Sequence, residues 1–290
     1  MTVKVEAKNI SLVYREFEAL KDINFTLENG RIYGLIGRNG AGKTSLLSLI
    51  AAYQQPTRGK VKIDGSIVFE NEEAMTQVTF VHKTDYKDEY GTVKQFIEFA
   101  MRYRPSFDLQ YAEQLISLFR LPTNKSIRKL STGMQSVFNV IIGLASRTPI
   151  TIFDEAYNGM DAPTREIFYR EILEEQARHP RIFILSTHLV SEMDYLFDDV
   201  IIIDQGKVVV QEDIDSLLQK GFSLTGSISD VEEVVDGLVV LNEEQLGGTK
   251  SVIVYGELPE EKVATIKQKG LEIGNVTLHD LFIQLTKEVN

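Results

Sequence analysis

The stretch GRNGAGKT (residues 37–44) lies between two apolar segments, RIYGLI (residues 31–36) and SLLSLIAAY (residues 45–53). The first segment is typical of a buried strand and the second of a helix, and the stretch itself matches the pattern G-x-x-x-x-G-K-[ST]. Glycines let a backbone wrap closely round a phosphate group, and the N-terminus of the following helix adds partial positive charge. The alternative is a glycine-rich turn without a ligand. Such a turn does not need a buried strand before it and a helix after it, so the flanking segments favour the nucleotide-binding loop. The sequence therefore predicts a nucleotide-binding loop in a protein of the α/β class.

This loop, the P-loop, supplies the first set of candidate site residues. We expect Lys43 to reach the β- and γ-phosphates and the hydroxyl of Thr44 to bind Mg²⁺. The full set expected to bind the nucleotide is Gly37, Arg38, Asn39, Gly40, Ala41, Gly42, Lys43, Thr44 and Ser45.

A second motif, ITIFDE (residues 150–155), has three apolar residues and a threonine followed by two acids. It is typical of a buried strand, and open α/β sheets bind ligands beyond the carboxyl ends of their strands. We expect Asp154 to hold Mg²⁺, directly or through water, and Glu155 to polarise the water that attacks the γ-phosphate. The alternative is that the two acids only cap the next helix.

The order of the predicted elements divides the chain into parts. Apolar strands at residues 149–155 and 181–188 flank a helical segment, and this alternation makes a parallel sheet. Residues 92–147 have the periodicity of amphipathic helices. We expect a P-loop NTPase domain over residues 1–215, with its helical subdomain at about 92–147. Residues 222–290 have the pattern of short strands and two helices, which predicts a small C-terminal α+β domain.

The last segment, VTLHDLFIQLTKEV (residues 276–289), has the spacing of an amphipathic helix. Its apolar residues are predicted to pack on the small C-terminal sheet and to carry no chemistry: Leu278, Leu281, Phe282 and Leu285.

Composition limits the class of protein. The chain has 290 residues, of which 43% are hydrophobic and 25% charged, as in soluble globular proteins. Its net charge of −11 argues against a general nucleic-acid binder. It has no cysteine, which excludes disulfides and thiolate metal sites. No apolar run reaches the roughly 18–20 residues that span a bilayer, so we expect a cytoplasmic protein whose membrane spans, if it needs any, belong to another chain.

The segment LSTGM (residues 130–134) precedes a further apolar stretch. Ser131 is suited to cap a helix there, and a helix N-terminus is also suited to hold an anion. The order of P-loop, helical region, LSTGM and ITIFDE closely resembles the ATP-binding cassette (ABC) family over about residues 1–215. The closing helix resembles that of exporter-type cassettes, especially antibiotic-resistance and peptide-export systems.

The resemblance implies roles for further residues. Tyr14 would stack on adenine, His188 would be the catalytic switch histidine, and Asp161 would belong to the D-loop. Ser131 and Gly133 would contact the γ-phosphate of ATP held by a second ABC subunit, so that a head-to-tail dimer completes each site. The alternatives are a structural histidine at 188 and a core aromatic at 14.

The chain departs from the family pattern at several places. Lys83 stands about where the family has a glutamine, and Thr132 and Met134 replace the usual glycine and glutamine after the signature serine. Ala156 and Tyr157 replace a proline and a threonine after the catalytic glutamate. A protonated lysine does not coordinate Mg²⁺, so we expect Lys83 to turn away and water to take that position.

The resemblance implies an ATPase subunit that uses ATP and Mg²⁺ and powers a separate transmembrane permease from the cytoplasmic face of the membrane. Its cargo would be an exported peptide, antibiotic or lipid-like molecule. The alternative is a soluble ABC-type ATPase of translation or DNA repair, but the chain has no second P-loop, no long heptad run and no cysteine. A small-molecule kinase would leave LSTGM and His188 unexplained.

Overall fold

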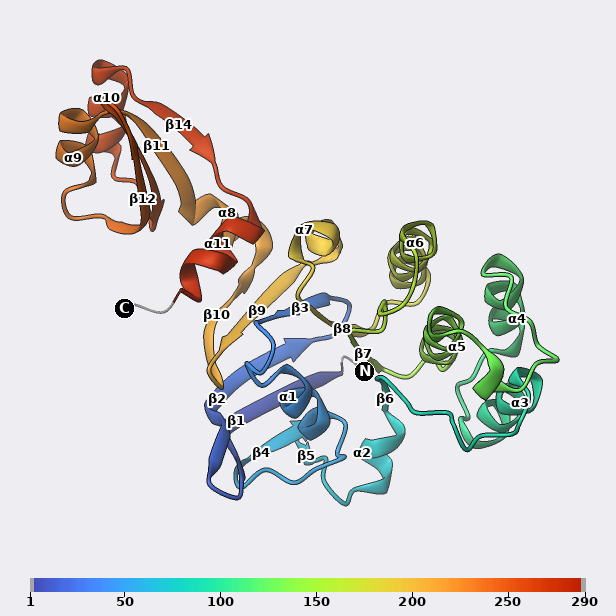
Figure 1. Ribbon diagram of the computed structural model, residues 1–290. Coiled ribbons are helices and arrows are strands. Elements are labelled where there is room, and N and C mark those ends of the chain that lie inside the picture. The colour runs from blue at the N-terminus through green and yellow to red at the C-terminus, as the bar shows by residue number, and fades with distance from the viewer. Residues whose placement is uncertain (1–2, 288–290) are drawn as a thin grey trace.

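The computed structural model describes residues 3–287, which form three β-sheets and the helices around them (Figure 1). The strands are β1 (Lys4–Tyr14), β2 (Phe17–Glu28), β3 (Ile32–Ile36), β4 (Arg58–Ile63), β5 (Ser66–Ile67), β6 (Val78–Val81), β7 (Ile150–Asp154), β8 (Ile182–Thr187), β9 (Asp199–Asp204), β10 (Lys207–Asp213), β11 (Gly221–Ser227), β12 (Val239–Leu246), β13 (Thr249–Tyr255) and β14 (Glu272–Asn275). The helices are α1 (Lys43–Ile50), α2 (Glu72–Thr76), α3 (Val93–Tyr103), α4 (Leu109–Leu118), η1 (Ile127–Lys129), α5 (Thr132–Ala145), α6 (Ala162–Arg178), α7 (Val190–Met193), η2 (Asp194–Leu196), α8 (Ile214–Lys220), α9 (Ile228–Val235), α10 (Glu260–Lys269) and α11 (Leu278–Leu285). None of these helices combines the length and the apolar character of a membrane span.

The central sheet has the strand order β10-β9-β3-β8-β7-β6 and is parallel except for β10 at its edge. Strands β3, β7 and β8 are buried along their whole length, because a parallel sheet is covered on both faces. One face packs on α1 and on the antiparallel sheet β2-β1-β4-β5. The other face packs on the layer that contains α5 and α6. The P-loop and ITIFDE therefore meet at the carboxyl edge of this sheet.

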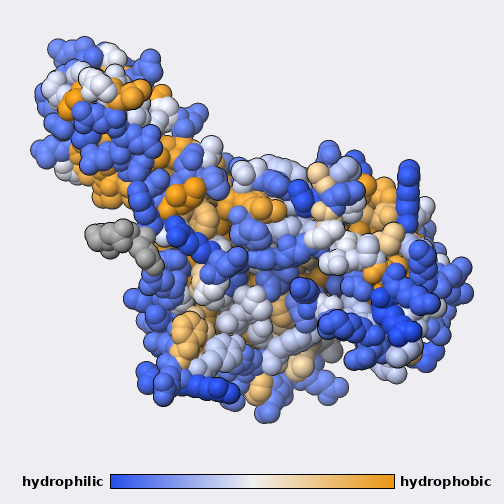
Figure 2. All heavy atoms as spheres, viewed as in Figure 1, coloured by the Kyte–Doolittle hydropathy of each residue, from blue (hydrophilic) through white to orange (hydrophobic). Residues whose placement is uncertain are grey.

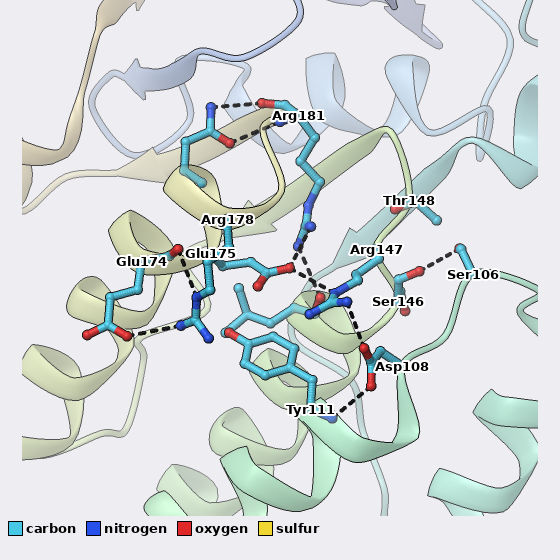
Figure 3. Close-up of polar contacts among 12 residues, drawn as sticks. Ser106, Asp108, Tyr111, Ser146, Arg147, Thr148, Glu174, Glu175, Arg178 and Arg181 are labelled. Atoms are coloured by element: carbon cyan, nitrogen blue, oxygen red, sulfur yellow. Dashed lines mark hydrogen bonds and ion pairs between the residues drawn. The ribbon is translucent and has the colours of Figure 1, made fainter.

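A polar network ties the helical region to this central body (Figure 3). The carboxylate of Glu175 on α6 is fully buried, and its Oε1 accepts hydrogen bonds from Arg181 Nη1 at 2.9 Å and Arg147 Nε at 3.1 Å. Arg147, just after α5, also reaches Asp108 Oδ2 at the start of α4 at 2.7 Å. Burial lowers the pKa of the Arg181 guanidinium, even though Glu175 opposes the shift. The network fixes α4 and α5 relative to α6 and β8.

The C-terminal sheet, β12-β13-β11-β14, projects from the body and has its own apolar cluster beneath α9 and α10 (Figure 1). Residues 221–287 contain three helices, so the prediction of two is wrong. The sequence of α9, ISDVEEVV, is rich in β-branched residues and favours a strand by propensity. The cap from the Ser227 side chain and the burial of Val231 and Val234 on one side make it a helix instead. Residues 288–290 of the predicted domain lie outside the described residues.

Helix α11 departs further from the prediction. Its buried residues, Leu278, Leu281 and Phe282, join the main apolar cluster of the body, and α11 packs against α7. The prediction that this apolar face packs on the small sheet is correct for part of its surface, since α11 also contacts β12 of that sheet. Leu241, Ile253 and Tyr255 of the sheet pack against the same cluster, and a Cβ on Gly221 at the start of β11 would lie 2.8 Å from Leu281. Figure 2 shows apolar side chains gathered at this junction.

Candidate nucleotide site

The P-loop needs glycine at three positions. Gly40 and Gly42 have φ angles of +82° and +111°, which side chains with a Cβ rarely adopt. A Cβ on Gly37 would lie 2.6 Å from the carbonyl oxygen of Ile203. Gly42 is also the N-cap of α1 and provides no side-chain cap, so the helix N-terminus stays open to an anion.

Lys43 is held over this loop although it is only 6% exposed. Its Nζ donates hydrogen bonds to the carbonyl oxygens of Gly37 at 2.7 Å and Arg38 at 3.3 Å. The same Nζ lies 3.6 Å from Glu155 Oε1. These partners compensate a buried ammonium and aim it at the loop, where a phosphate would bind.

A cavity of about 530 Å³ lies in front of the loop. Its lining includes Tyr14, Phe17 and Lys83. Tyr14 and Phe17 are direct partners across the β1–β2 hairpin, and the Tyr14 hydroxyl donates to Gln54 Oε1 at 2.6 Å. Phe17 is 64% exposed and was missed from sequence, although pairing across a two-residue turn would have placed it beside Tyr14.

The two expected Mg²⁺ ligands lie together on the wall of this cavity. Thr44 Oγ1 donates to Asp154 Oδ2 at 2.7 Å, and Ser186 Oγ donates to the other carboxylate oxygen. A hydroxyl and a carboxylate are hard oxygen donors that suit Mg²⁺, which usually keeps several waters and phosphate oxygens as its other ligands. Between residues 3 and 287 no group of three or more His, Asp or Glu side chains is arranged to hold a metal on its own. The pair therefore fits a metal that arrives with the nucleotide.

Glu155 follows Asp154 with a φ of +47°, an uncommon conformation for a residue with a side chain. Its carboxylate lies 3.1 Å from His188 Nδ1 and accepts a hydrogen bond from Asn158 Nδ2 at 3.1 Å. Burial acts to raise its pKa, but the hydrogen bonds with His188 and Asn158 and the charge of Lys43 outweigh burial and hold the pKa below its ordinary value. Glu155 is thus an ionised acceptor beside the cavity.

Tyr157 is a second partner of His188 that sequence reasoning missed. Its hydroxyl lies 3.2 Å from His188 Nδ1 and accepts a hydrogen bond from Thr187 Oγ1 at 3.1 Å. Burial raises the pKa of Tyr157, so the phenol stays neutral. Glu155 and Tyr157 together hold the imidazole at the end of β8, where the sequence predicts a switch histidine.

Residues 20–158 match the family model described as ABC transporter. The chain contains an ABC transporter ATPase domain. It is 25% identical over 284 residues to the ABC transporter ATP-binding protein YtrB of Bacillus subtilis, covering 96% of this chain and 97% of that protein. It is 26% identical over 293 residues to the sulfate/thiosulfate import ATP-binding protein CysA 1 of Agrobacterium fabrum, covering 95% of this chain and 84% of the relative. Residues 20–158 thus carry the domain of this family, and the chain is similar to ATP-binding proteins of ABC transporters along nearly its whole length.

Solved structures share the fold of this ABC domain. One is a dimeric ATP-binding cassette bound to ADP and phosphate in a post-hydrolysis state, with a TM-score of 0.63 and 21% identity. The similarity covers 72% of this chain and 98% of that one.

The signature and D-loop residues of the ABC domain lie apart from the cavity. Ser131 Oγ accepts a hydrogen bond from the Met134 backbone N–H and caps α5, and Asp161 caps α6. Gly133 packs so closely on the D-loop that a Cβ would lie 2.3 Å from the carbonyl oxygen of Gly159. Ser131, Gly133 and Asp161 do not line the cavity of their own chain. These three residues are therefore separate from the cavity that holds the P-loop.

Proposed function

We propose that the chain hydrolyses MgATP at this cavity and drives a separate transmembrane permease, from the cytoplasmic face of the membrane. The observation that carries the proposal is the convergence of Lys43, Asp154, Glu155 and His188 at one edge of the central sheet. An ionised glutamate touches both the buried lysine and the histidine there, which suits phosphoryl transfer to water.

ATP binding is assigned to the residues that line the cavity. Tyr14 would stack on adenine, the P-loop backbone N–H groups would surround the phosphates, and Lys43 would contact the β- and γ-phosphates. Thr44 and Asp154 would hold Mg²⁺, which neutralises phosphate charge when it is bound. Glu155 would orient the attacking water, and His188 would hold the carboxylate of Glu155 in position beside the γ-phosphate.

Completion of the site is assigned to a second ABC subunit, identical or paralogous. Ser131 and Gly133 lie at the N-terminus of α5, where the helix dipole favours an anion. In a head-to-tail dimer this end would face the γ-phosphate bound by the partner, with Asp161 at the same interface. A Ser131→Arg variant should keep ATP binding and lose hydrolysis, and mixing it with the unaltered chain should restore part of the activity. Full activity of Ser131→Arg alone would show that the serine only caps α5.

The surface that would bind the permease is an apolar groove of about 370 Å³ between β6 and the helical region. Aromatic side chains make much of its lining: Tyr53, Phe80, Tyr86, Phe96, Phe99 and Tyr103. Phe99 is 51% exposed, so a charge there should not unfold the chain. We expect Phe99→Glu to abolish co-purification of a multi-span membrane protein from detergent extracts while ATP binding is unchanged. Tyr195→Glu, at an exposed position outside this groove, is the control. Capture of ribosomes or DNA instead would favour the soluble ABC-type alternative.

Export of a peptide, antibiotic or lipid-like molecule is proposed from the family resemblance of the closing helix. A relative of similar identity is named as an import protein, so direction needs a direct measurement. ATP-driven uptake of labelled substrate into inverted membrane vesicles is expected for an exporter, and uptake into right-side-out vesicles would contradict it.

A further inference from the structure

Helix α7 begins shortly after His188 and is only four residues long. Its N-cap residue, Leu189, makes no side-chain capping bond, and the 3₁₀ turn η2 follows it at once. A helix this short does not hold its shape by itself, because helix nucleation is unfavourable. The geometry of the segment after His188 is therefore set by what packs on it.

One support of α7 is polar. Arg165 on α6 pairs with Glu192 on α7, with Nε to Oε2 at 3.0 Å and Nη2 to Oε1 at 3.2 Å. Arg165 Nη1 also donates to the carbonyl oxygen of Met160 at 3.3 Å. This support links α7 to the D-loop.

The other support is apolar and comes from the far end of the chain. Val190 and Met193 of α7 are 0% and 1% exposed, and α11 packs against this helix. Leu278 and Leu281 of α11 are 1% and 0% exposed in the same cluster. These contacts cross from the C-terminal unit to the segment that carries the switch histidine.

We propose that α11 is a positioning element for hydrolysis: its buried face holds α7, and α7 holds His188 against Glu155 and Tyr157. The inference rests on the proposed role of His188. It gives the C-terminal unit a function, because a partner that shifts the small sheet would shift α11 and with it the histidine. Leu281 is the central positioning residue, since it touches both the body and Gly221 at the start of the sheet.

The test is Leu281→Ala in the full chain, with steady-state ATPase kinetics and ATP affinity measured separately. We expect kcat to fall by about 3- to 10-fold with KM and ATP affinity unchanged, because a displacement of the order of 1 Å at a catalytic group costs up to about 100-fold. Leu281→Met, which nearly conserves volume, should restore kcat. Ile283→Ala is the matched control on the exposed side of the same helix and should change nothing.

A double-mutant cycle separates positioning from loss of structure. If α11 acts through His188, Leu281→Ala should lower kcat no further in a His188→Ala background. Additive losses, or a fall in ATP affinity, would overturn the inference. Wild-type kcat in His188→Ala alone would instead overturn the proposed role of the histidine. Should Leu281→Ala unfold the chain, Phe282→Leu removes less volume and is put through the same cycle with the same expected outcomes.

Discussion

The nucleotide edge of the central sheet and the C-terminal sheet use charged side chains in opposite ways. At the nucleotide edge Lys43 is 6% exposed and is surrounded by two carbonyl oxygens and Glu155. In the C-terminal unit Lys269 pairs with Asp230 and Glu233 outside a wholly apolar cluster. Burial of a charge is unfavourable unless partners compensate it. The buried Lys43 therefore depends on its partners, whereas the exposed Lys269 does not. The comparison implies that substitutions of charge should have large effects in the first region and small ones in the second.

The largest effect is expected at Glu155. Glu155→Gln should lower kcat by about 10²- to 10⁴-fold, because an amide is a poor acceptor for the proton of the attacking water. ATP should still bind, and the variant should accumulate an ATP-bound dimer that size-exclusion chromatography detects. Hydrolysis at the wild-type rate would remove Glu155 from the mechanism and weaken the contrast between the two regions.

The next effect concerns stability and two adjacent glutamates on α6. Glu175 is fully buried between Arg147 and Arg181, whereas Glu174 is 51% exposed in pairs with other arginines. Glu175→Gln should lower the free energy of unfolding by about 3–5 kcal/mol, because two guanidinium groups lose their buried counter-charge. Glu174→Gln should leave the free energy of unfolding nearly unchanged, because exposed ion pairs contribute little to stability. Urea denaturation of both variants measures the difference, and equal midpoints would break the comparison.

A smaller effect is expected for the exposed lysine at the rim of the cavity. Lys83 lines the cavity, and within residues 3–287 no ion pair joins it to Asp154 or Glu155. Lys83→Gln should leave the ATPase rate at low Mg²⁺ unchanged or raise it by up to about twofold, since an ammonium near the metal site is repelled. If hydrolysis is lost while ATP still binds, Lys83 is catalytic and belongs with the buried group.

The smallest effect is expected in the C-terminal unit. Lys269→Ala removes both of its surface ion pairs and should shift the thermal midpoint by less than about 2 °C, because such pairs are screened by water. The hydrolysis rate should be unchanged. A large drop in either quantity would show that the surface charges of this sheet are part of a coupled network.

The sequence predicted those features of the site that depend on short spacing. The P-loop glycines and the two acids at the end of β7 are local patterns, and the structure places them at one sheet edge. Tyr157 and Ser186 were not predicted, because each acts through a contact between strands or loops that are separate in the sequence, whereas Phe17 was missed although its pairing with Tyr14 is local. Ser186 reaches Asp154 only because β8 lies beside β7.

Amphipathic spacing was a weaker guide in the C-terminal unit. It identified which side of α11 is apolar and its contact with the small sheet, but not its contact with α7. The helix packs on α7 (Val190–Met193) as well as on β12, and helical spacing within one segment carries no information about which distant segment it meets. In α9, propensity favoured a strand, and capping with burial decided for a helix.

The chain enters the C-terminal sheet from α8 and leaves it into α11, and both helices are seated in the core of the body. Phe222 and Asn275, at the two ends of this excursion, are paired across neighbouring strands. The sheet is therefore an insertion with adjacent ends and not a tail. The ends of this insertion already lie side by side. A replacement domain whose termini are also close would therefore cost the chain little extra loop-closure entropy on folding. Because the ends of residues 222–275 are adjacent, we expect a reporter domain with close termini to be accepted there by a chain that still folds and binds ATP.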